Sequence, residues 1–140
     1  MPMHRSGSPV RMHYKLSTGG QGDLTNVSTR PTTLYGIAGF NNSTGVIAYL
    51  KIYDISTGIS SVTSTAGTPS GVFLIPCGVS PTTVAIGAGI SVQFPQGWIL
   101  TNGLSYSIVA GAADNSTVAV TAAQVIINIL HDSTYILAAT

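Results

Sequence analysis

The chain has 140 residues, a length that suits one domain and lets it bury a core without disulfides. Only 6% of the residues are charged, against about a quarter in ordinary soluble domains; glutamate is absent and the formal net charge is +1. The single cysteine, Cys77, excludes an intramolecular disulfide and a zinc site built on paired cysteines.

The first 30 residues differ from the rest of the chain in charge. They hold one acidic residue, Asp23, and four basic ones: Arg5, Arg11, Lys15 and Arg30. The segment is rich in Ser, Gly and Pro, so we predict an extended basic N-terminal arm over 1–30 and a β-sandwich domain over 31–140. Its charges are too sparse for a nucleic-acid tail. We therefore expect no nucleic-acid partner, and we expect the arm to lie against a neighbouring subunit or a shell.

The domain begins with two strong strand patterns. Residues 34–40 form the first and end in the turn cluster 41–45. Residues 46–54 form the second, which alternates between two faces. The face predicted to enter the core is wholly apolar and consists of Val46, Ala48, Leu50 and Ile52. The face predicted to point outward consists of Ile47, Tyr49, Lys51 and Tyr53.

Shorter elements follow. Residues 56–70 predict a long connection with an edge strand at 59–62, and further strands are expected at 72–76, 83–86, 90–94 and 98–100. The dipeptide Asn102-Gly103 predicts a two-residue hairpin that leads into a strand at 104–110.

The last third of the chain begins with a polar loop at 111–117. The segment 118–130 is long enough for a helix, but its β-branched side chains favour a strand. Residues 134–139 predict a tail or an added edge strand. Seven to nine short strands in this spacing predict an all-β fold, an antiparallel β-sandwich or jelly roll.

The residue types that catalysis requires are scattered. The four carboxylates are far apart in the sequence, two of the three histidines lie in the predicted arm, and no Gly-x-Ser-x-Gly motif occurs. No metal-ligand spacing and no phosphate-binding glycine loop is present. Cys77 follows an apolar strand and predicts a buried, inert thiol. We therefore predict a protein that is not an enzyme, with no catalytic residues, no cofactor and no metal.

The surface composition predicts a protein that works inside an assembly. Serine and threonine make up 33 of the 140 residues, and a surface of such neutral residues repels its neighbours only weakly. The alternative is an ordinary sandwich with a neutral polar surface. The mean hydropathy is +0.40, yet no apolar run approaches the roughly 20 residues of a spanning helix, so we expect no membrane partner.

Three aromatic side chains are candidates for an interface. Tyr49 and Tyr53 flank Lys51 on the predicted outward face, and Trp98 follows a Pro-Gln-Gly turn. Tyrosine and tryptophan are favoured contact residues, so we interpret them as contacts to a subunit. The alternative is a sugar-stacking platform.

Several stretches resemble a group of small bacteriophage virion proteins. They are 34–37, 49–54, 97–104, 111–120 and 125–130. The resemblance implies a structural β-sandwich protein, and similar proteins often serve as capsid decoration, or cement, proteins on the outer shell, commonly as trimers. It implies as partners a major capsid protein and further copies of the chain, expected as a homotrimer, with assembly in the host cytoplasm. The alternatives are a tail, neck or fibre protein and, from another class, a carbohydrate-binding module.

Overall fold

A computed structural model describes residues 10–57, 67–79 and 87–133 of the chain. Within these ranges it contains one short 3-10 helix, η1 (Gln21–Asp23), and eight strands. The strands are β1 (Arg11–Leu16), β2 (Thr25–Ser28), β3 (Thr32–Asn41), β4 (Ala48–Tyr53), β5 (Gly71–Ile75), β6 (Ala88–Leu100), β7 (Leu104–Val109) and β8 (Val125–Asp132).

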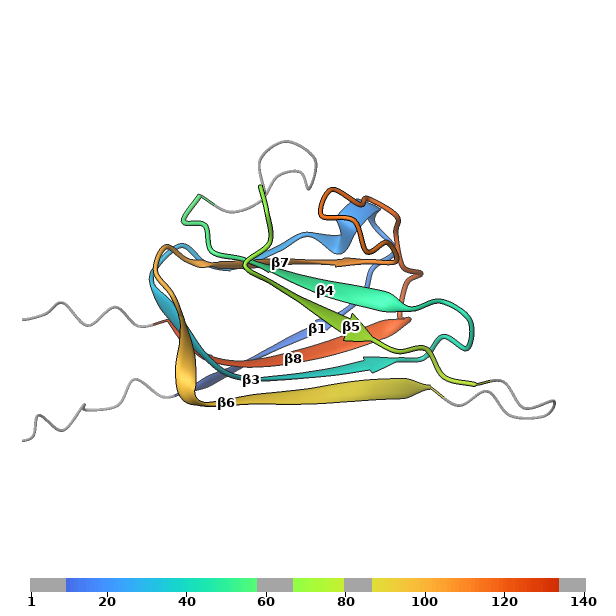
Figure 1. The fold of residues 1–140 in the computed structure, drawn as a ribbon, viewed down its shortest axis with the longest axis horizontal. Coiled ribbons are helices and arrows are strands. Elements are labelled where there is room, and N and C mark those ends of the chain that lie inside the picture. Colours follow the sequence, from blue (N-terminus) through green and yellow to red (C-terminus); the bar gives the residue numbers. More distant parts are fainter. Residues whose placement is uncertain (1–9, 58–66, 80–86, 134–140) are drawn as a thin grey trace, which may run out of the picture.

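The strands form two four-stranded sheets that pack as the two layers of a sandwich (Figure 1). Sheet A has the strand order β1-β8-β3-β6, and sheet B has the order β2-β7-β4-β5. Every pairing between neighbours is antiparallel. The predicted all-β antiparallel sandwich is therefore confirmed.

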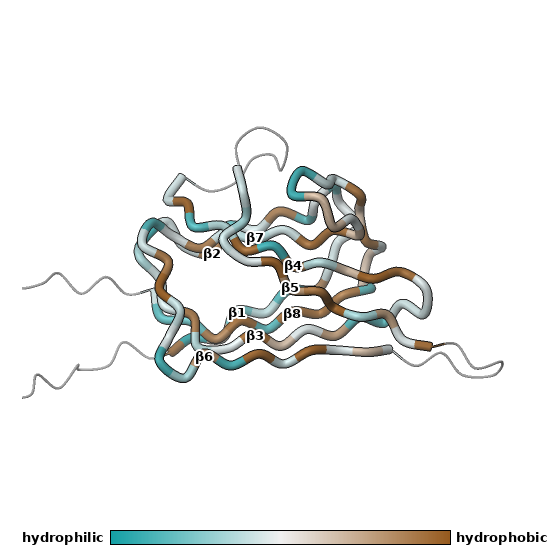
Figure 2. Tube along the Cα trace, in the orientation of Figure 1, coloured by the Kyte–Doolittle hydropathy of each residue, from teal (hydrophilic) through white to brown (hydrophobic). Residues whose placement is uncertain are grey.

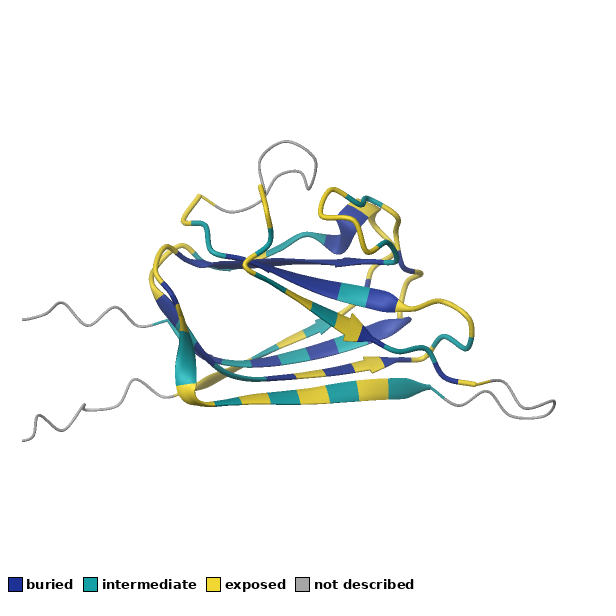
Figure 3. Cartoon of the chain, viewed as in Figure 1, coloured by how far each residue is buried: buried dark blue, intermediate teal, exposed yellow. Residues whose placement is uncertain are grey.

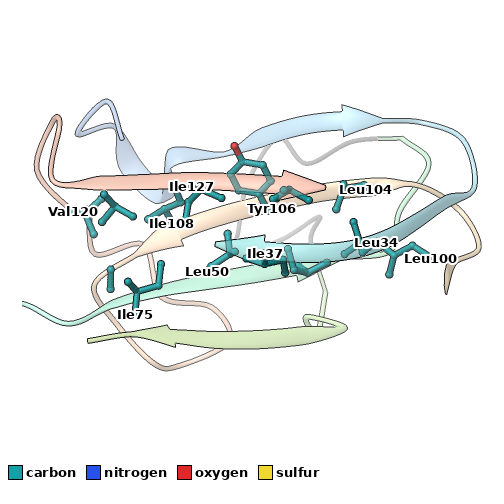
Figure 4. Close-up of a cluster of buried hydrophobic side chains, with 14 residues drawn as sticks. Leu34, Ile37, Leu50, Ile75, Leu100, Leu104, Tyr106, Ile108, Val120 and Ile127 are labelled. Atoms are coloured by element: carbon teal, nitrogen blue, oxygen red, sulfur yellow. The ribbon is translucent and has the colours of Figure 1, made fainter. Parts of the chain in front are cut away.

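The core lies between the sheets and follows the alternation of the strands. On β4 the predicted core side chains Ala48, Leu50 and Ile52 are fully buried, whereas Val46 precedes the strand and is exposed. They meet the inward side chains of sheet A, such as Ile37 and Ile127 (Figure 4). Hydrophobic positions recur along the strands of both sheets (Figure 2). Each fully buried Leu or Ile stabilises the fold by about 1.5–3 kcal/mol.

The predicted arm is largely part of the sandwich. Residues 11–16 form β1, which pairs with β8, and residues 25–28 form β2, which pairs with β7. The predicted boundary at residue 30 therefore does not separate an arm from a body. The sequence pattern missed β1 because polar residues occupy its inward positions.

The predicted hairpin at Asn102-Gly103 is wrong. This turn leaves β6 in sheet A and enters β7 in sheet B, so it connects the two layers. The Asp54 carboxylate holds the turn, because it accepts hydrogen bonds from the backbone N–H groups of Thr101 (3.0 Å), Asn102 (2.7 Å) and Gly103 (3.1 Å). A tertiary contact thus overrides the local preference of the dipeptide.

Two strand predictions change in extent. The segments 90–94 and 98–100 belong to one strand, β6, which tolerates Pro95 because it lies at a sheet edge. The helix considered for 118–130 is absent, and the predicted strand forms only from Val125 onward. The strands predicted at 59–62, 83–86 and 134–139 lie outside the described residues.

Candidate interaction surfaces

Two basic residues of the predicted arm, Arg11 and Arg30, lie at the same end of the sandwich. Arg11 is the exposed first residue of β1, and Arg30 is exposed just before β3. Both positions lie at the end of sheet A where β8 finishes, because Arg11 faces His131 and Thr33 faces Asp132. Arg5 lies outside the described residues.

Lys15 has a structural partner instead. Its ammonium group lies 3.3 Å from the buried carboxylate of Asp23. The same carboxylate accepts hydrogen bonds from the backbone N–H of Thr18 (2.8 Å) and from its hydroxyl (3.0 Å). Lys15 therefore stabilises the turn between β1 and β2 and is not available as a free basic contact.

The predicted outward face of β4 is covered by the chain itself. Lys51 is 0% exposed and Tyr53 is 1% exposed, so the prediction that they point into solvent is wrong. The Lys51 ammonium donates a hydrogen bond to the carbonyl of Ala113 in the loop that follows β7. Burial lowers the pKa of Lys51, although nearby Asp114 acts in the opposite direction. Alternation identified this face of β4 correctly, but it could not predict that a later loop covers it.

The outer face of sheet B is also covered at β7, the strand next to β4 in the centre of the sheet. All six residues of β7 are buried on both faces (Figure 3). Tyr53 packs against Leu24 and Ile55, and burial raises the pKa of its hydroxyl, a shift that the Ser107 side chain opposes. The centre of sheet B therefore offers little of its outer face to a partner, whereas on the edge strand β5 Val72 and Leu74 are 45% and 48% exposed.

Trp98 belongs to an aromatic cluster at an open edge. Its ring centroid lies 6.1 Å from that of Phe73 on β5 and 5.5 Å from that of Phe94 on β6. A hollow of about 470 Å³ lies beside the cluster, lined also by Gly71 and Gly97. Tyr49, which is half-buried on β4, does not line this hollow. The structure therefore does not join the three predicted interface aromatics into one surface.

Two histidines face the inside of the sandwich. His13 Nε2 lies 2.8 Å from the hydroxyl of Tyr106, and His131 Nδ1 lies 2.7 Å from the hydroxyl of Ser133. Burial lowers the pKa of both histidines, and the positive charge of Lys15 lowers that of His13 further. Within the described ranges no group of three or more His, Cys, Asp or Glu side chains could hold a metal ion.

Sheet A, in contrast, presents a bare outer face. The cross-strand register places twelve of its outward side chains in three rows of four, one from each strand. In the order β1-β8-β3-β6 the rows are Met12, Leu130, Gly36 and Gln93; Tyr14, Asn128, Ala38 and Ser91; and Leu16, Ile126, Phe40 and Gly89. None of these side chains is charged. We call these twelve residues the bare face. A further outward row, Asp132, Thr33 and Ile99, lies at the end of the sheet where β8 finishes.

Large apolar side chains of the bare face are open to solvent. Met12 is 60% exposed, Tyr14 58% and Phe40 43%. A shallow groove of about 410 Å³ crosses the first two rows where Gly36 and Ala38 leave space. The sequence carried one signal for this face, the alternation of apolar and polar residues from Met12 to Leu16, but the surrounding loop residues obscured it.

Comparisons of the chain with protein-family models, with curated proteins and with solved structures give no match. The fold and surface define an antiparallel β-sandwich in which the outer face of sheet B is covered over its centre and that of sheet A is uncovered. The described part contains no helix that is long and apolar enough to cross a membrane.

Proposed function

We propose that the protein is a structural component of a bacteriophage particle, and specifically a capsid decoration, or cement, protein on the outer shell. The observation that carries the proposal is the strand order. Eight antiparallel strands in the orders 1-8-3-6 and 2-7-4-5 support an eight-stranded jelly roll, an architecture that recurs in viral capsid domains. Fold-level likeness alone does not define a function, so the surface has to support the same conclusion.

The surface supports a role in an assembly. Soluble proteins rarely leave a large apolar patch uncovered, and such patches mark interaction sites. The bare face of sheet A is such a patch, and the low charge of the chain lets many copies pack closely. In this proposal the rigid sandwich bridges neighbouring shell proteins and stabilises the contacts between capsomers. Many symmetric copies multiply the effect of each weak contact.

The basic end provides the proposed shell contact. Arg11 and Arg30 are exposed there, and the chain that precedes β1 carries Arg5. We expect these side chains to lie along an acidic or polar surface of the major capsid protein. Lys15 is excluded from this role because it is paired with Asp23.

Binding to purified, undecorated shells tests this role. Replacing the three arginines by Ser should weaken binding at least about tenfold, and raised salt should weaken the wild-type protein in the same direction. The matched control replaces the same residues by Lys, which keeps the charges and should keep binding within about threefold. Equal binding by the Ser and Lys variants would contradict the proposed contact.

The number of copies per particle separates decoration from a tail, neck or fibre role. Quantitative mass spectrometry of purified particles should find this chain in numbers comparable with the major capsid protein. A handful of copies would move the protein to the tail, the neck or a single vertex. Absence from particles would overturn the virion proposal.

The aromatic hollow supports a second candidate function, a carbohydrate-binding module, since jelly rolls also occur in lectins. The earlier platform of Trp98 with Tyr49 and Tyr53 is not available, because Tyr53 is buried. Trp98, Phe73 and Phe94 would form the apolar side of a sugar site instead. A glycan array probed with wild-type protein and with Trp98→Ala tests this candidate, and an array without hits counts against it.

A further inference from the structure

The relief of the bare face differs from one edge to the other. On β1 the outward side chains Met12, Tyr14 and Leu16 are large and form a ridge. On β3 and β6 the second row holds only Ala38 and Ser91, and the first row holds Gly36. In the third row the Phe40 side chain lies over Gly89. The face therefore carries a ridge along β1 and a trough in the first two rows near β6.

From this relief we propose that two copies of the chain pack bare face to bare face, about a two-fold axis that runs parallel to the strands between β8 and β3. This rotation places β1 of each copy over β6 of the other and keeps the rows aligned. Tyr14 of each copy then enters the trough beside Ala38 and Ser91 of the second copy. The contact is isologous, as closed dimers require.

The absence of charge on the bare face supports a second copy of the chain as the partner that covers it. None of the twelve side chains of the bare face is charged, so two identical faces meet without repulsion and without burying an unpaired charge. The nearest charged side chain on this side of the sheet is Asp132, which lies beyond the first row at the end of the face. Sheets that pack face to face lie about 10 Å apart, which leaves room for Tyr14 and Met12 to interdigitate.

The area of the face sets the expected affinity. Four strands span roughly 19 Å across, and six residues span roughly 20 Å along the strands, so two faces bury at least about 800 Å² before side-chain relief is counted. Stable interfaces bury about 1,200–2,000 Å² in total. We therefore expect a weak dimer with a dissociation constant on the order of micromolar. The inference does not depend on the role in a virion.

Sedimentation equilibrium of the full chain between about 1 and 500 μM tests the association. The expected result is a reversible shift from 14.3 kDa, the mass of one chain, to twice that value. A single chain at every concentration would overturn the proposal. A trimer, as the sequence resemblance implies, would also overturn it, because a face-to-face pair has no place for a third copy.

Substitutions that introduce charge test whether the dimer interface lies on the bare face. Tyr14→Lys introduces two unpaired ammonium groups into the interface and should raise the dissociation constant at least about thirtyfold. Ser91→Asp should act similarly. The double variant Tyr14→Lys/Ser91→Asp places each Lys beside an Asp of the other copy and should recover association to within about threefold of wild type. Failure to recover, with unchanged circular dichroism, contradicts the proposed register.

A thiol cross-link provides a test that does not depend on affinity. β1 and β6 are three strand spacings apart within one chain, about 14 Å, whereas the facing backbones of two packed sheets lie about 10 Å apart, and both distances exceed the reach of a direct disulfide. In a Cys77→Ser background, a short bifunctional maleimide should therefore join Tyr14→Cys/Ser91→Cys chains into a covalent dimer. Tyr14→Cys alone is the control and should stay monomeric on a denaturing gel. A cross-link in the control would place β1 over β1 and overturn the proposed axis.

Discussion

Replacing Asp54 should show how strongly a single carboxylate stabilises the connection between the two sheets. Its two oxygens accept hydrogen bonds from the three backbone N–H groups of residues 101–103 and from the Thr101 hydroxyl (3.2 Å). A Cβ at Gly103 would lie 2.5 Å from the carbonyl oxygens of Ser28 and Ile55, so this turn has no room to rearrange. In Asp54→Ala the turn at 101–103 stays in this packed position, but its backbone N–H groups lose the carboxylate that accepts their hydrogen bonds.

Hydrogen bonds to a charged group contribute about 1.5–3 kcal/mol each, but Asp54 is only half-buried and water replaces part of the loss. We therefore expect Asp54→Ala to reduce the free energy of unfolding by about 2–3 kcal/mol in total. At roughly 3–4 °C per kcal/mol for a domain of this size, the midpoint of thermal unfolding falls by about 6–12 °C. Asp54→Asn keeps one oxygen acceptor and should lose about half as much.

Guanidinium unfolding followed by fluorescence provides the measurement, because Trp98 is the only tryptophan. Desolvation acts to raise the pKa of Asp54, but the hydrogen bonds from residues 101–103 hold it below its ordinary value of 3.8. The stabilisation is therefore complete above pH 3.8 and is lost as the pH falls through the lowered pKa of the folded protein. A difference between wild type and Asp54→Ala below about 0.5 kcal/mol at pH 7, or one that persists at pH 2, would refute the reasoning.

Three further predictions concern the same fold. Because burial lowers the pKa of His13 and His131 below the ordinary 6.5, the unfolded chain binds protons more readily, and the free energy of unfolding should decrease as the pH falls below 6.5. Guanidinium unfolding at pH 7.5 and 5.5 measures this slope, which a double His→Gln variant should flatten. Deletion of residues 1–30 should abolish cooperative unfolding in circular dichroism because it removes β1 and β2, whereas deletion of residues 1–9 should not. Lys51→Met removes the hydrogen bond to the loop above β4 and should accelerate amide hydrogen exchange in that loop at least about tenfold, while stability changes by less than about 2 kcal/mol.

For each of these three predictions, one result would contradict the physical reason given for it. A pH slope equal in wild type and the double His variant would mean that other groups cause the acid sensitivity. A stable fold without residues 1–30 would restore the idea of a separate arm. Unchanged exchange in the Lys51→Met loop would show that packing alone holds this loop in place.

Local pattern was sufficient for much of the fold. The alternation of residues 46–54 identified Ala48, Leu50 and Ile52 as core side chains, and the β-branched run at 125–130 identified β8 as a strand. Both signals depend only on neighbours in the sequence and on the two-residue period of a strand.

Features that depend on distant partners were not predictable in the same way. β1 is stabilised by pairing with β8, whose residues lie more than a hundred positions later, and the turn at 101–103 is held by Asp54. The burial of Lys51 likewise depends on a loop that the strand pattern does not contain. The bare face combines side chains from β1, β3, β6 and β8, so no single segment could reveal it.

The place of β8 in sheet A has a consequence for how the protein is made. β8 is the last described strand of the chain, yet it lies between β1 and β3, and it is the one strand among those described that pairs with β1. A chain still attached to the ribosome therefore holds β1 without a partner until β8 emerges, and such long-range pairing is slow. Sheet A, with its apolar outer surface, is completed only after β8 has emerged. Partial chains that end before β8 thus lack the surface through which finished copies would associate, and association of such chains is avoided.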